Sequence, residues 1–393
     1  MGAIQDRLWE KAVKHRFPLT AAFELLPNCN LQCKMCYVRK SMAEVNEMGG
    51  LLTTDEWLSY ARQARDLGML YPLLTGGEPF LRDDLQELLA KMQEMGLQVS
   101  INSNGTLIGE DTAKWLSRHK PTRINITIYG ASEESYQKLC GDGGAYERLL
   151  RAVSLLKQYD VPVKFNTSIT PYNIEDLGAM IAYAKSVGSP IQVATYMFPP
   201  VRRDAGMIGQ NDRLSPEKAA YAKVKADFLQ NEPSWFLGQA YYYSRFLMPM
   251  DEMLAKQAAG EGHEMTCRAG RCSFWLDWQG NVGNCGMYSS VKYNLKEMTL
   301  REAWEKTVME IEQVRYSPVC TNCPNFKICH SCIAMVHNEC GDVNGRPDYL
   351  CRYNAAAAHY YRVFAEKISS AAPEEIRLQS VPNAECDFEQ DIF

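Results

Sequence analysis

Apolar runs with the character of buried strands alternate, along the first half of the chain, with segments whose apolar residues recur at three- and four-residue intervals. The second pattern places the apolar side chains on one face of a helix. Six runs predict strands, at Ala21–Leu26, Leu70–Thr75, Leu97–Asn102, Arg123–Tyr129, Pro162–Ile169 and Ile191–Met197. The intervening segments predict helices, among them Asp55–Leu67, Asp83–Met95, Ala145–Tyr159 and Ile174–Val187. Such alternation is typical of an α/β fold with a parallel sheet and helices outside it.

Six strand–helix units are fewer than the eight that close a (β/α)8 barrel. The pattern therefore predicts an open, partial (β/α)6 TIM-like barrel, which we assign to residues 19–230. In parallel barrels the functional side chains lie at the C-terminal ends of the strands. We therefore expect the site in the loops that follow these strands.

The rest of the chain divides by composition into an N-terminal segment at 1–18, a linker or bridging segment at 231–266, a small cysteine-rich domain at 267–355, and a C-terminal helix and tail at 356–393. Tyr241, Tyr242 and Tyr243 lie in an aromatic-rich helical stretch of the linker. Such side chains can stack on a substrate peptide, but an aromatic stripe at helical spacing more often belongs to a core. Both interpretations stay open.

Composition and charge narrow the classes of function. Of the 393 residues, 46% are hydrophobic, enough for one large domain and a smaller one. The chain carries 42 basic and 47 acidic residues without a Lys- or Arg-rich run, so a nucleic-acid partner is not expected. The sequence shows no signal peptide and no membrane-spanning apolar run, which predicts a cytoplasmic protein without membrane contact. In that compartment, 14 cysteines favour metals or chemistry over disulfides.

Three cysteines, Cys29, Cys33 and Cys36, follow the first predicted strand in one short loop, and an aromatic residue, Tyr37, comes directly after them. Three thiolates can hold three corners of a 4Fe–4S cluster and leave the fourth iron open to a ligand, whereas four thiolates close the site. The alternative interpretation is a zinc knuckle or a set of free cysteines.

A second motif, Gly76-Gly77-Glu78-Pro79, follows the second predicted strand. The two motifs together resemble the signature of the radical S-adenosylmethionine (radical SAM) enzymes, and zinc would not explain the second one. The resemblance implies a 4Fe–4S cluster on the three cysteines and a SAM-binding site at Gly76, Gly77, Glu78 and Pro79. There glycine allows close backbone approach, and the glutamate can accept a hydrogen bond from the SAM ammonium.

Later strand ends extend the resemblance. Ser103 and Asn104 lie in a turn similar to the family's third-strand turn, and Thr127 stands where relatives have a serine. By position, Thr127 and Arg151 are expected to contact the ribose or carboxylate of SAM, although Tyr129 replaces an acid found in many relatives. The structural alternative is a polar turn, a strand threonine and a solvated helix arginine.

The C-terminal cysteines have a spacing that resembles the SPASM domain, an extension of peptide-modifying radical SAM enzymes that binds auxiliary iron–sulfur clusters. Phe274 to Trp278 and the turn that follows predict the β-hairpin that opens such a domain. By analogy with the family's interleaved ligation, two auxiliary clusters are expected, one on Cys267, Cys272, Cys285 and Cys332, the other on Cys320, Cys323, Cys329 and Cys351.

Three points stay open in this module. Cys329 and Cys332 have two residues between them where relatives usually have three, and only some relatives supply a ligand at Cys272, so one cluster could be incompletely ligated. Cys140, Cys340 and Cys386 receive no role. The alternative is a pair of zinc sites that use His330 and His337.

The resemblance implies a common first step, in which a reduced cluster cleaves SAM to a 5′-deoxyadenosyl radical that abstracts hydrogen from the substrate. Auxiliary clusters imply removal of a further electron. We therefore expect oxidative modification of a ribosomally made peptide, such as a crosslink or thioether. The alternatives are a sulfatase-maturase-like enzyme that makes formylglycine, a small-molecule dehydrogenase, and, outside the enzymes, an iron–sulfur electron carrier or a zinc-binding interaction protein. No catalytic acid or base is singled out.

Partners follow from this expectation. Only 28 residues precede Cys29, fewer than the roughly 40 that usually fold independently, so recognition of a leader peptide would need a separate protein. A reducing donor such as flavodoxin or ferredoxin would supply the electron.

Overall fold

The computed structural model describes residues 3–246, 267–288, 291–323, 325–326, 329 and 332–370. Within these ranges, nine strands form one sheet in the order β6-β5-β4-β3-β2-β1-β7-β8-β9. The first six are parallel to their neighbours and are β1 (Thr20–Glu24), β2 (Tyr71–Thr75), β3 (Ser100–Ser103), β4 (Arg123–Thr127), β5 (Val163–Ser168) and β6 (Ile191–Ala194). The α/β fold with a partial barrel is confirmed.

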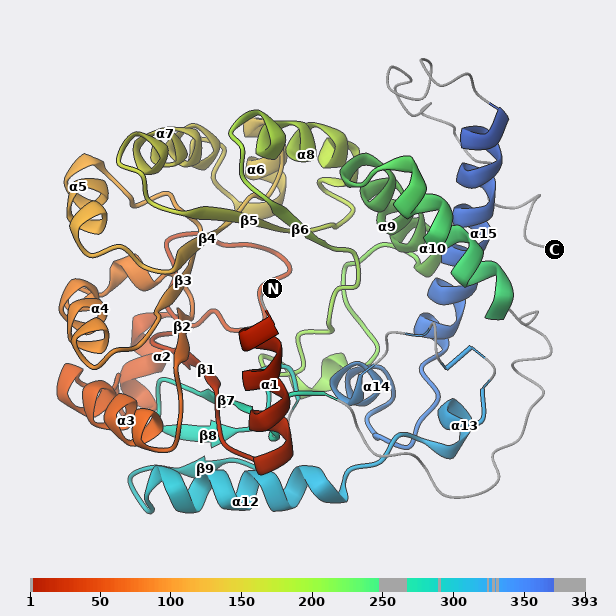
Figure 1. The fold of residues 1–393 in the computed structure, drawn as a ribbon. Coiled ribbons are helices and arrows are strands. Elements are labelled where there is room, and N and C mark those ends of the chain that lie inside the picture. Colours follow the sequence, from red (N-terminus) through yellow and green to blue (C-terminus); the bar gives the residue numbers. More distant parts are fainter. Residues whose placement is uncertain are drawn as a thin grey trace.

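Helices lie outside this part of the sheet, as Figure 1 shows along its left and upper sides. They are α3 (Thr54–Asp66), α4 (Leu85–Glu94), α5 (Glu110–Arg118), α6 (Glu133–Cys140), α7 (Ala145–Gln158) and α8 (Leu177–Ser186), with shorter turns α2 (Met42–Glu47), η1 (Pro79–Leu81) and η2 (Ile174–Asp176). Local signals set their ends. Thr53 and Glu56 form a capping box at the start of α3, and Gly141, with φ of 75°, ends α6.

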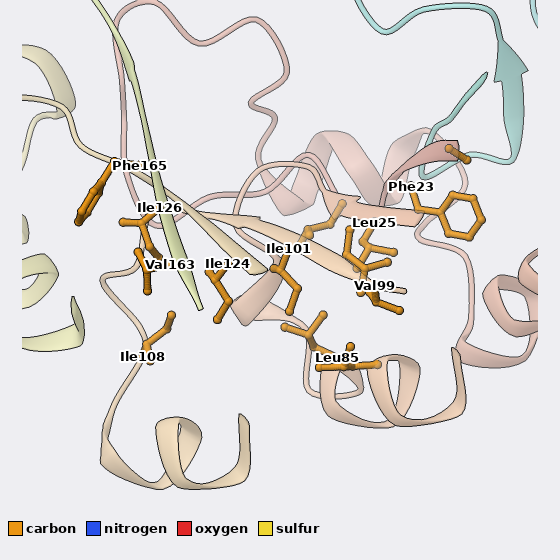
Figure 2. Packing of buried hydrophobic residues seen from close by; sticks show 14 of the residues in the cluster. Phe23, Leu25, Leu85, Val99, Ile101, Ile108, Ile124, Ile126, Val163 and Phe165 are labelled. Carbon is orange, nitrogen blue, oxygen red and sulfur yellow. The ribbon is translucent and has the colours of Figure 1, made fainter. Parts of the chain in front are cut away.

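The main core lies between the strands and these helices. Alternate residues of each strand point outward, so that Ile101, Ile124, Ile126 and Phe165 lie beside one another and are fully buried. Figure 2 shows this row with helix-side residues such as Leu85 below it. Burial of each large apolar side chain contributes about 1.5–3 kcal/mol, which fixes the strands and thereby the loops at their C-terminal ends.

The expected C-terminal β-hairpin is present. Strands β7 (Ser273–Leu276) and β8 (Asn281–Gly283) are antiparallel, and β9 (Tyr293–Asn294) pairs with β8. Asp277 holds the turn, because its Oδ1 accepts from the backbone N–H groups of Gln279 and Asn281, both at 3.0 Å. The sequence did not predict where the hairpin attaches: β7 pairs in parallel with β1, with Thr20 opposite Ser273.

The remaining described helices are α1 (Ala3–His15), η3 (Ala205–Met207), α9 (Pro216–Gln230), α10 (Pro233–Phe246), α12 (Leu300–Gln313), α13 (Pro318–Thr321), α14 (Ile333–Cys340) and α15 (Asp348–Ser370). Helices α9, α10 and α15 share a separate hydrophobic cluster, on the right of Figure 1. Tyr243 belongs to it, since its ring stacks on Tyr361 with centroids 4.4 Å apart. Tyr242 is half-buried and Tyr241 is exposed, so the tyrosine stripe is in part core.

None of the helices in the described ranges is long and apolar enough to cross a membrane. Two residues discussed from the sequence, His330 and Cys386, lie outside the described residues, as do residues 247–266 of the linker and the tail from residue 371.

Candidate functional site

The loop after β1 holds Cys29, Cys33 and Cys36, all of them half-buried. Backbone N–H groups point at two of the sulfurs, Leu31 at Cys29 Sγ (3.4 Å) and Arg39 at Cys36 Sγ (3.3 Å). Burial raises the pKa of Cys29 to about 12 and also raises that of Cys36. Three thiolates this close together need a compensating positive charge. The donor set therefore fits a group larger than a single ion, such as an iron–sulfur cluster, whose positive charge offsets the three sulfurs.

Cys140, to which the sequence assigned no role, lies against this loop at the end of α6. The backbone N–H of Gln32 donates to the Cys140 carbonyl (2.9 Å), and that of Lys34 donates to the Leu139 carbonyl (3.0 Å). A hydrogen bond from the Cys140 thiol is the main cause that lowers the pKa of Cys33. Burial opposes this, and a smaller effect of the Tyr129 hydroxyl adds to it. No local motif marks Cys140, because only the fold brings it to Cys33.

The two glycines after β2 are required by the protein's own packing. A Cβ on Gly76 would lie 2.3 Å from the Leu26 carbonyl oxygen, and one on Gly77 would lie 1.9 Å from that of Asn28. The backbone N–H groups of Gly77 and Glu78 donate to the carbonyls of Leu26 (2.7 Å) and Asn28 (2.9 Å). These hydrogen bonds join the loops after β1 and β2 at the residues that immediately precede Cys29.

Glu78 is fully buried, and Pro79 begins the short helix η1 beside it. The Glu78 carboxylate accepts from Asn104 N–H (2.7 Å), Ser103 Oγ (2.8 Å) and Phe80 N–H (3.1 Å). Burial raises its pKa to about 7, although these hydrogen bonds act in the opposite direction. These three hydrogen bonds make the side chain a link between the loops after β2 and β3, and its contact with a ligand ammonium stays a prediction.

Asn104 extends the link to the cysteine loop. Its Nδ2 donates to Asn30 Oδ1 (2.9 Å) and approaches Cys29 Sγ at 3.7 Å, while its Oδ1 accepts from Thr106. Asn30 Nδ2 in turn donates to Thr106 Oγ1 (2.9 Å). One hydrogen-bond network therefore connects the loops after β1, β2 and β3.

The other two expected SAM contacts differ in position. Thr127 is half-buried at the end of β4, opposite Asn166 of β5. Arg151 lies exposed on α7, where its charge acts with Lys114 on Glu110. The structure does not bring Arg151 into the network of the first three loops.

A cavity of about 320 Å³ lies between the cysteine loop, the loop after β6 and the C-terminal hairpin. The cysteine loop contributes Tyr37 and Lys40 to its wall. The loop after β6 contributes Arg202 and Arg203, and Cys285 comes from the C-terminal hairpin region. The Arg202 guanidinium makes two bonds with the Glu24 carboxylate of β1, at 2.9 and 3.0 Å. The Trp275 indole N–H donates to the same carboxylate (2.8 Å). Burial raises the pKa of Tyr37, so its hydroxyl stays neutral.

The C-terminal cysteines form two groups. In the first, burial is the main cause that raises the pKa of Cys332 to about 11, and the nearby sulfurs of Cys285 and Cys267 add to it. Cys272 is fully buried, lies near Cys267, and packs in a small hydrophobic cluster with Leu19. Its carbonyl accepts from the backbone N–H groups of Leu19 and Thr20.

The second group lines one cavity, whose wall includes Cys320, Cys323, Cys329 and Cys351. The Asn354 amide donates to Cys329 Sγ at 3.3 Å. Burial raises the pKa of both Cys320 and Cys351 to about 12, and neighbouring sulfurs add to this. Within the described ranges, no set of three or more His, Cys, Asp or Glu residues is arranged to hold a single metal ion. An iron–sulfur cluster is larger than a single ion. Its fit here rests on the burial of the cysteines, on the repulsion between their sulfurs, and on the one cavity that the second group lines.

The chain is similar to several known proteins. Residues 23–184 match the model of the radical SAM superfamily. The AdoMet-dependent heme synthase of Methanosarcina barkeri is 27% identical over 339 residues, which cover 83% of this chain and 94% of the relative. The PqqA peptide cyclase of Granulibacter bethesdensis is 31% identical over 192 residues, 48% of this chain and 50% of the relative.

Two solved structures share the fold. Streptococcus suis SuiB, bound to the precursor peptide SuiA, has a TM-score of 0.63 at 17% identity, with 88% of this chain and 80% of that chain covered. The enzyme anSMEcpe with bound AdoMet also has a TM-score of 0.63, at 20% identity, with 89% of this chain and 100% of that chain covered. Residues 23–184 therefore form a radical SAM domain, and the chain shares its fold with SuiB and anSMEcpe.

Proposed function

We propose that this enzyme is an oxidoreductase that oxidises a ribosomally made peptide by forming a crosslink, thioether or related bond at a C–H position. The observation that carries the proposal is the cavity of about 320 Å³, because a single space borders both the residues directly after Cys36 and the auxiliary-group cysteine Cys285. A substrate in it would lie between the group that starts the reaction and a group that can accept an electron.

Cys29, Cys33 and Cys36 would hold the 4Fe–4S cluster that the superfamily implies. When bound, this cluster and SAM supply a 5′-deoxyadenosyl radical able to take a hydrogen atom from an unactivated carbon. The role of the protein itself would be to hold and orient the cluster, SAM and the substrate. The proposed SAM contacts stay Tyr37, Gly76, Gly77, Glu78, Pro79, Ser103, Asn104, Thr127 and Arg151. Glu78 and Asn104 also keep the three loops in fixed relation.

Two auxiliary clusters are proposed for the two C-terminal cysteine groups. The second group has four sulfurs around one cavity and would be closed. In the first, Cys272 is the least accessible member and already lies in an apolar cluster. Net oxidation would balance if the peptide gave one hydrogen atom to the 5′-deoxyadenosyl radical, which becomes 5′-deoxyadenosine, one electron to an auxiliary cluster and one proton to solvent. A separate leader-binding protein and a donor such as flavodoxin or ferredoxin remain proposed partners.

The chain's own side chains would exclude water from this space. Tyr37, Trp275 and Trp278 line it with aromatic surface, and the Arg202–Glu24 ion pair closes one wall. The Glu24 side chain is only 1% exposed, so this wall is fixed before any substrate arrives. Exclusion of water and fixed geometry are the contributions expected of a protein in radical chemistry.

Anaerobic turnover with SAM, a reductant and candidate precursor peptides tests the proposal. We expect 5′-deoxyadenosine together with a peptide mass lower by two hydrogen atoms. A variant with Cys320→Ala and Cys323→Ala should still form 5′-deoxyadenosine but lose peptide oxidation, whereas replacement of Cys29, Cys33 and Cys36 by Ala should abolish both. Formation of 5′-deoxyadenosine without any change in peptide mass would count against a peptide substrate.

A second candidate is oxidation of a small molecule. It is favoured by the AdoMet-dependent heme synthases, which are similar across most of both chains, whereas the PqqA peptide cyclase matches about half of each. A sulfatase-maturase-like reaction on a protein Cys or Ser remains a third. The turnover experiment separates them by the substrate whose mass changes.

A further inference from the structure

The proposed substrate cavity carries an imbalance of charge. Its wall contains four basic side chains, Lys40, Arg202, Arg203 and Lys292, but only two acidic ones, Glu24 and Asp277. A partly enclosed wall weakens the screening of charge by solvent, so unbalanced cations there favour an anionic ligand.

Both acidic side chains already have basic partners. Glu24 is bound by Arg202 at 2.9 Å, and the Asp277 carboxylate lies 3.0 Å from Lys292 Nζ. Asp277 also accepts the hydrogen bonds that hold the hairpin turn. Neither carboxylate is therefore available to neutralise the remaining cations.

Lys40 and Arg203 are the cations left without an acidic partner among the described residues. Arg203 is exposed and donates only to the Cys36 carbonyl, at 3.3 Å. Lys40 is half-buried and forms no ion pair with a residue that the structure describes. Its charge acts on Glu44, whose pKa is lowered first by the hydrogen bond from the Ser41 backbone N–H and further by Lys40. Both cations lie beside the cysteine loop.

We propose that Lys40 and Arg203 bind a carboxylate of the substrate and so select an acidic substrate. This inference rests on the proposed function, because it assigns a substrate class to the same cavity. A guanidinium binds a carboxylate with two parallel hydrogen bonds, and an ammonium adds a point charge. The carboxylate would belong to a glutamate or aspartate side chain of a peptide, or to a small carboxylic acid in the second candidate function.

Binding without turnover tests the proposal. The anaerobically reconstituted full-length enzyme with SAM is dialysed to equilibrium against isotope-labelled N-acetyl-Ala-Glu-Ala-amide, its Gln counterpart, or glutarate. We expect the Glu peptide to bind at least about tenfold more tightly than the Gln peptide, the effect of a charge-assisted hydrogen bond. Lys40→Gln and Arg203→Gln should each remove most of this preference. Lys218→Gln, an exposed lysine of α9 outside the cavity, is the matched control.

Each outcome decides the question. Three results would overturn the carboxylate site: equal binding of the two peptides by the wild type, binding of no probe, or a preference that persists when Lys40→Gln and Arg203→Gln are combined. Binding of glutarate alone, lost in both single variants, would support the site with a small-molecule source. Iron content and thermal unfolding of each variant report whether it is folded. Because no turnover is involved, failure here is separate from failure of peptide oxidation.

Discussion

Arg213 and Glu339 form a bidentate ion pair, with Nη1–Oε1 and Nη2–Oε2 distances of 2.5 and 2.8 Å, between the segment before α9 and the end of α14. The side chains are only 8% and 6% exposed. The Tyr196 hydroxyl donates to the same carboxylate, and the Tyr349 ring centroid lies 3.7 Å from the guanidinium carbon. The pair connects the loop after β6 to the helix that follows Cys332.

Loss of one partner of this pair should be costly. Glu339→Gln leaves a buried guanidinium without its counter-charge, which typically costs about 3–5 kcal/mol of unfolding free energy. Denaturant unfolding followed by circular dichroism measures this. Glu217→Gln is the control, because its partner Arg352 is 56% exposed and such pairs contribute about 1 kcal/mol or less. Equal effects of the two substitutions would contradict the structural assignment.

Gly77→Ala should disrupt the contact between the loops after β1 and β2. The new Cβ would lie 1.9 Å from the Asn28 carbonyl oxygen, so the cysteine loop must move. We expect lower iron content and a lower unfolding temperature. Gly178→Ala, in α8 with open space around it, should be neutral or should stabilise by about 1 kcal/mol. Normal iron content in Gly77→Ala would show that the loops tolerate separation.

Glu78 should make stability depend on pH. Its pKa in the folded protein is about 7, above the ordinary value of 4.5, because the carboxyl is buried. Between pH 4.5 and about 7 the folded state therefore keeps a proton on Glu78 that the unfolded state has released. The free energy of unfolding falls as the pH rises through this range. Above pH 7 the loss of unfolding free energy reaches its full size of roughly 3 kcal/mol. Glu78→Gln has no titration there, and the stability difference between variant and wild type should change across this range. A constant difference would contradict the raised pKa.

Cys140 should influence the cluster proposed on Cys33. Its thiol donates to the Cys33 sulfur, and such a bond stabilises the reduced, more negative cluster. Cys140→Ala should lower the midpoint potential, measured by redox titration with electron paramagnetic resonance, by roughly 40 mV for a bond worth about 1 kcal/mol. Cys140→Ser keeps a donor and should shift the potential less. An unchanged potential in the alanine variant would remove Cys140 from the site.

Metal analysis separates the interpretations of the C-terminal cysteines. Three clusters predict about twelve iron and twelve sulfide per chain after anaerobic reconstitution. Cys320→Ala together with Cys351→Ala should lower the iron by about four. A zinc interpretation predicts about four iron with one or two zinc, and that result would turn the C-terminal module into a structural element.

The sequence predicted the six parallel strands and the hairpin because each has a local signal, an apolar run or a turn. It could not predict contacts between distant segments. The approach of Cys140 to Cys33, the pairing of β7 with β1, and the burial of Glu78 under Asn104 all depend on the closed fold. Nor could it predict that a Cβ on Gly76 or Gly77 would meet the backbone of Leu26 and Asn28, while the contact of these glycines with SAM stays a prediction.

The pairing of β7 with β1 has a consequence for synthesis of the protein. On the ribosome, β1 and its cysteine loop emerge early, but the strand that covers the second edge of β1 is formed by residues 273–276. Until then that edge keeps unpaired N–H and C=O groups, which are prone to wrong strand pairing. The nascent chain therefore completes the pairing of the strand before the loop of Cys29, Cys33 and Cys36 only after the first cysteines of the C-terminal module, Cys267 and Cys272, have been made.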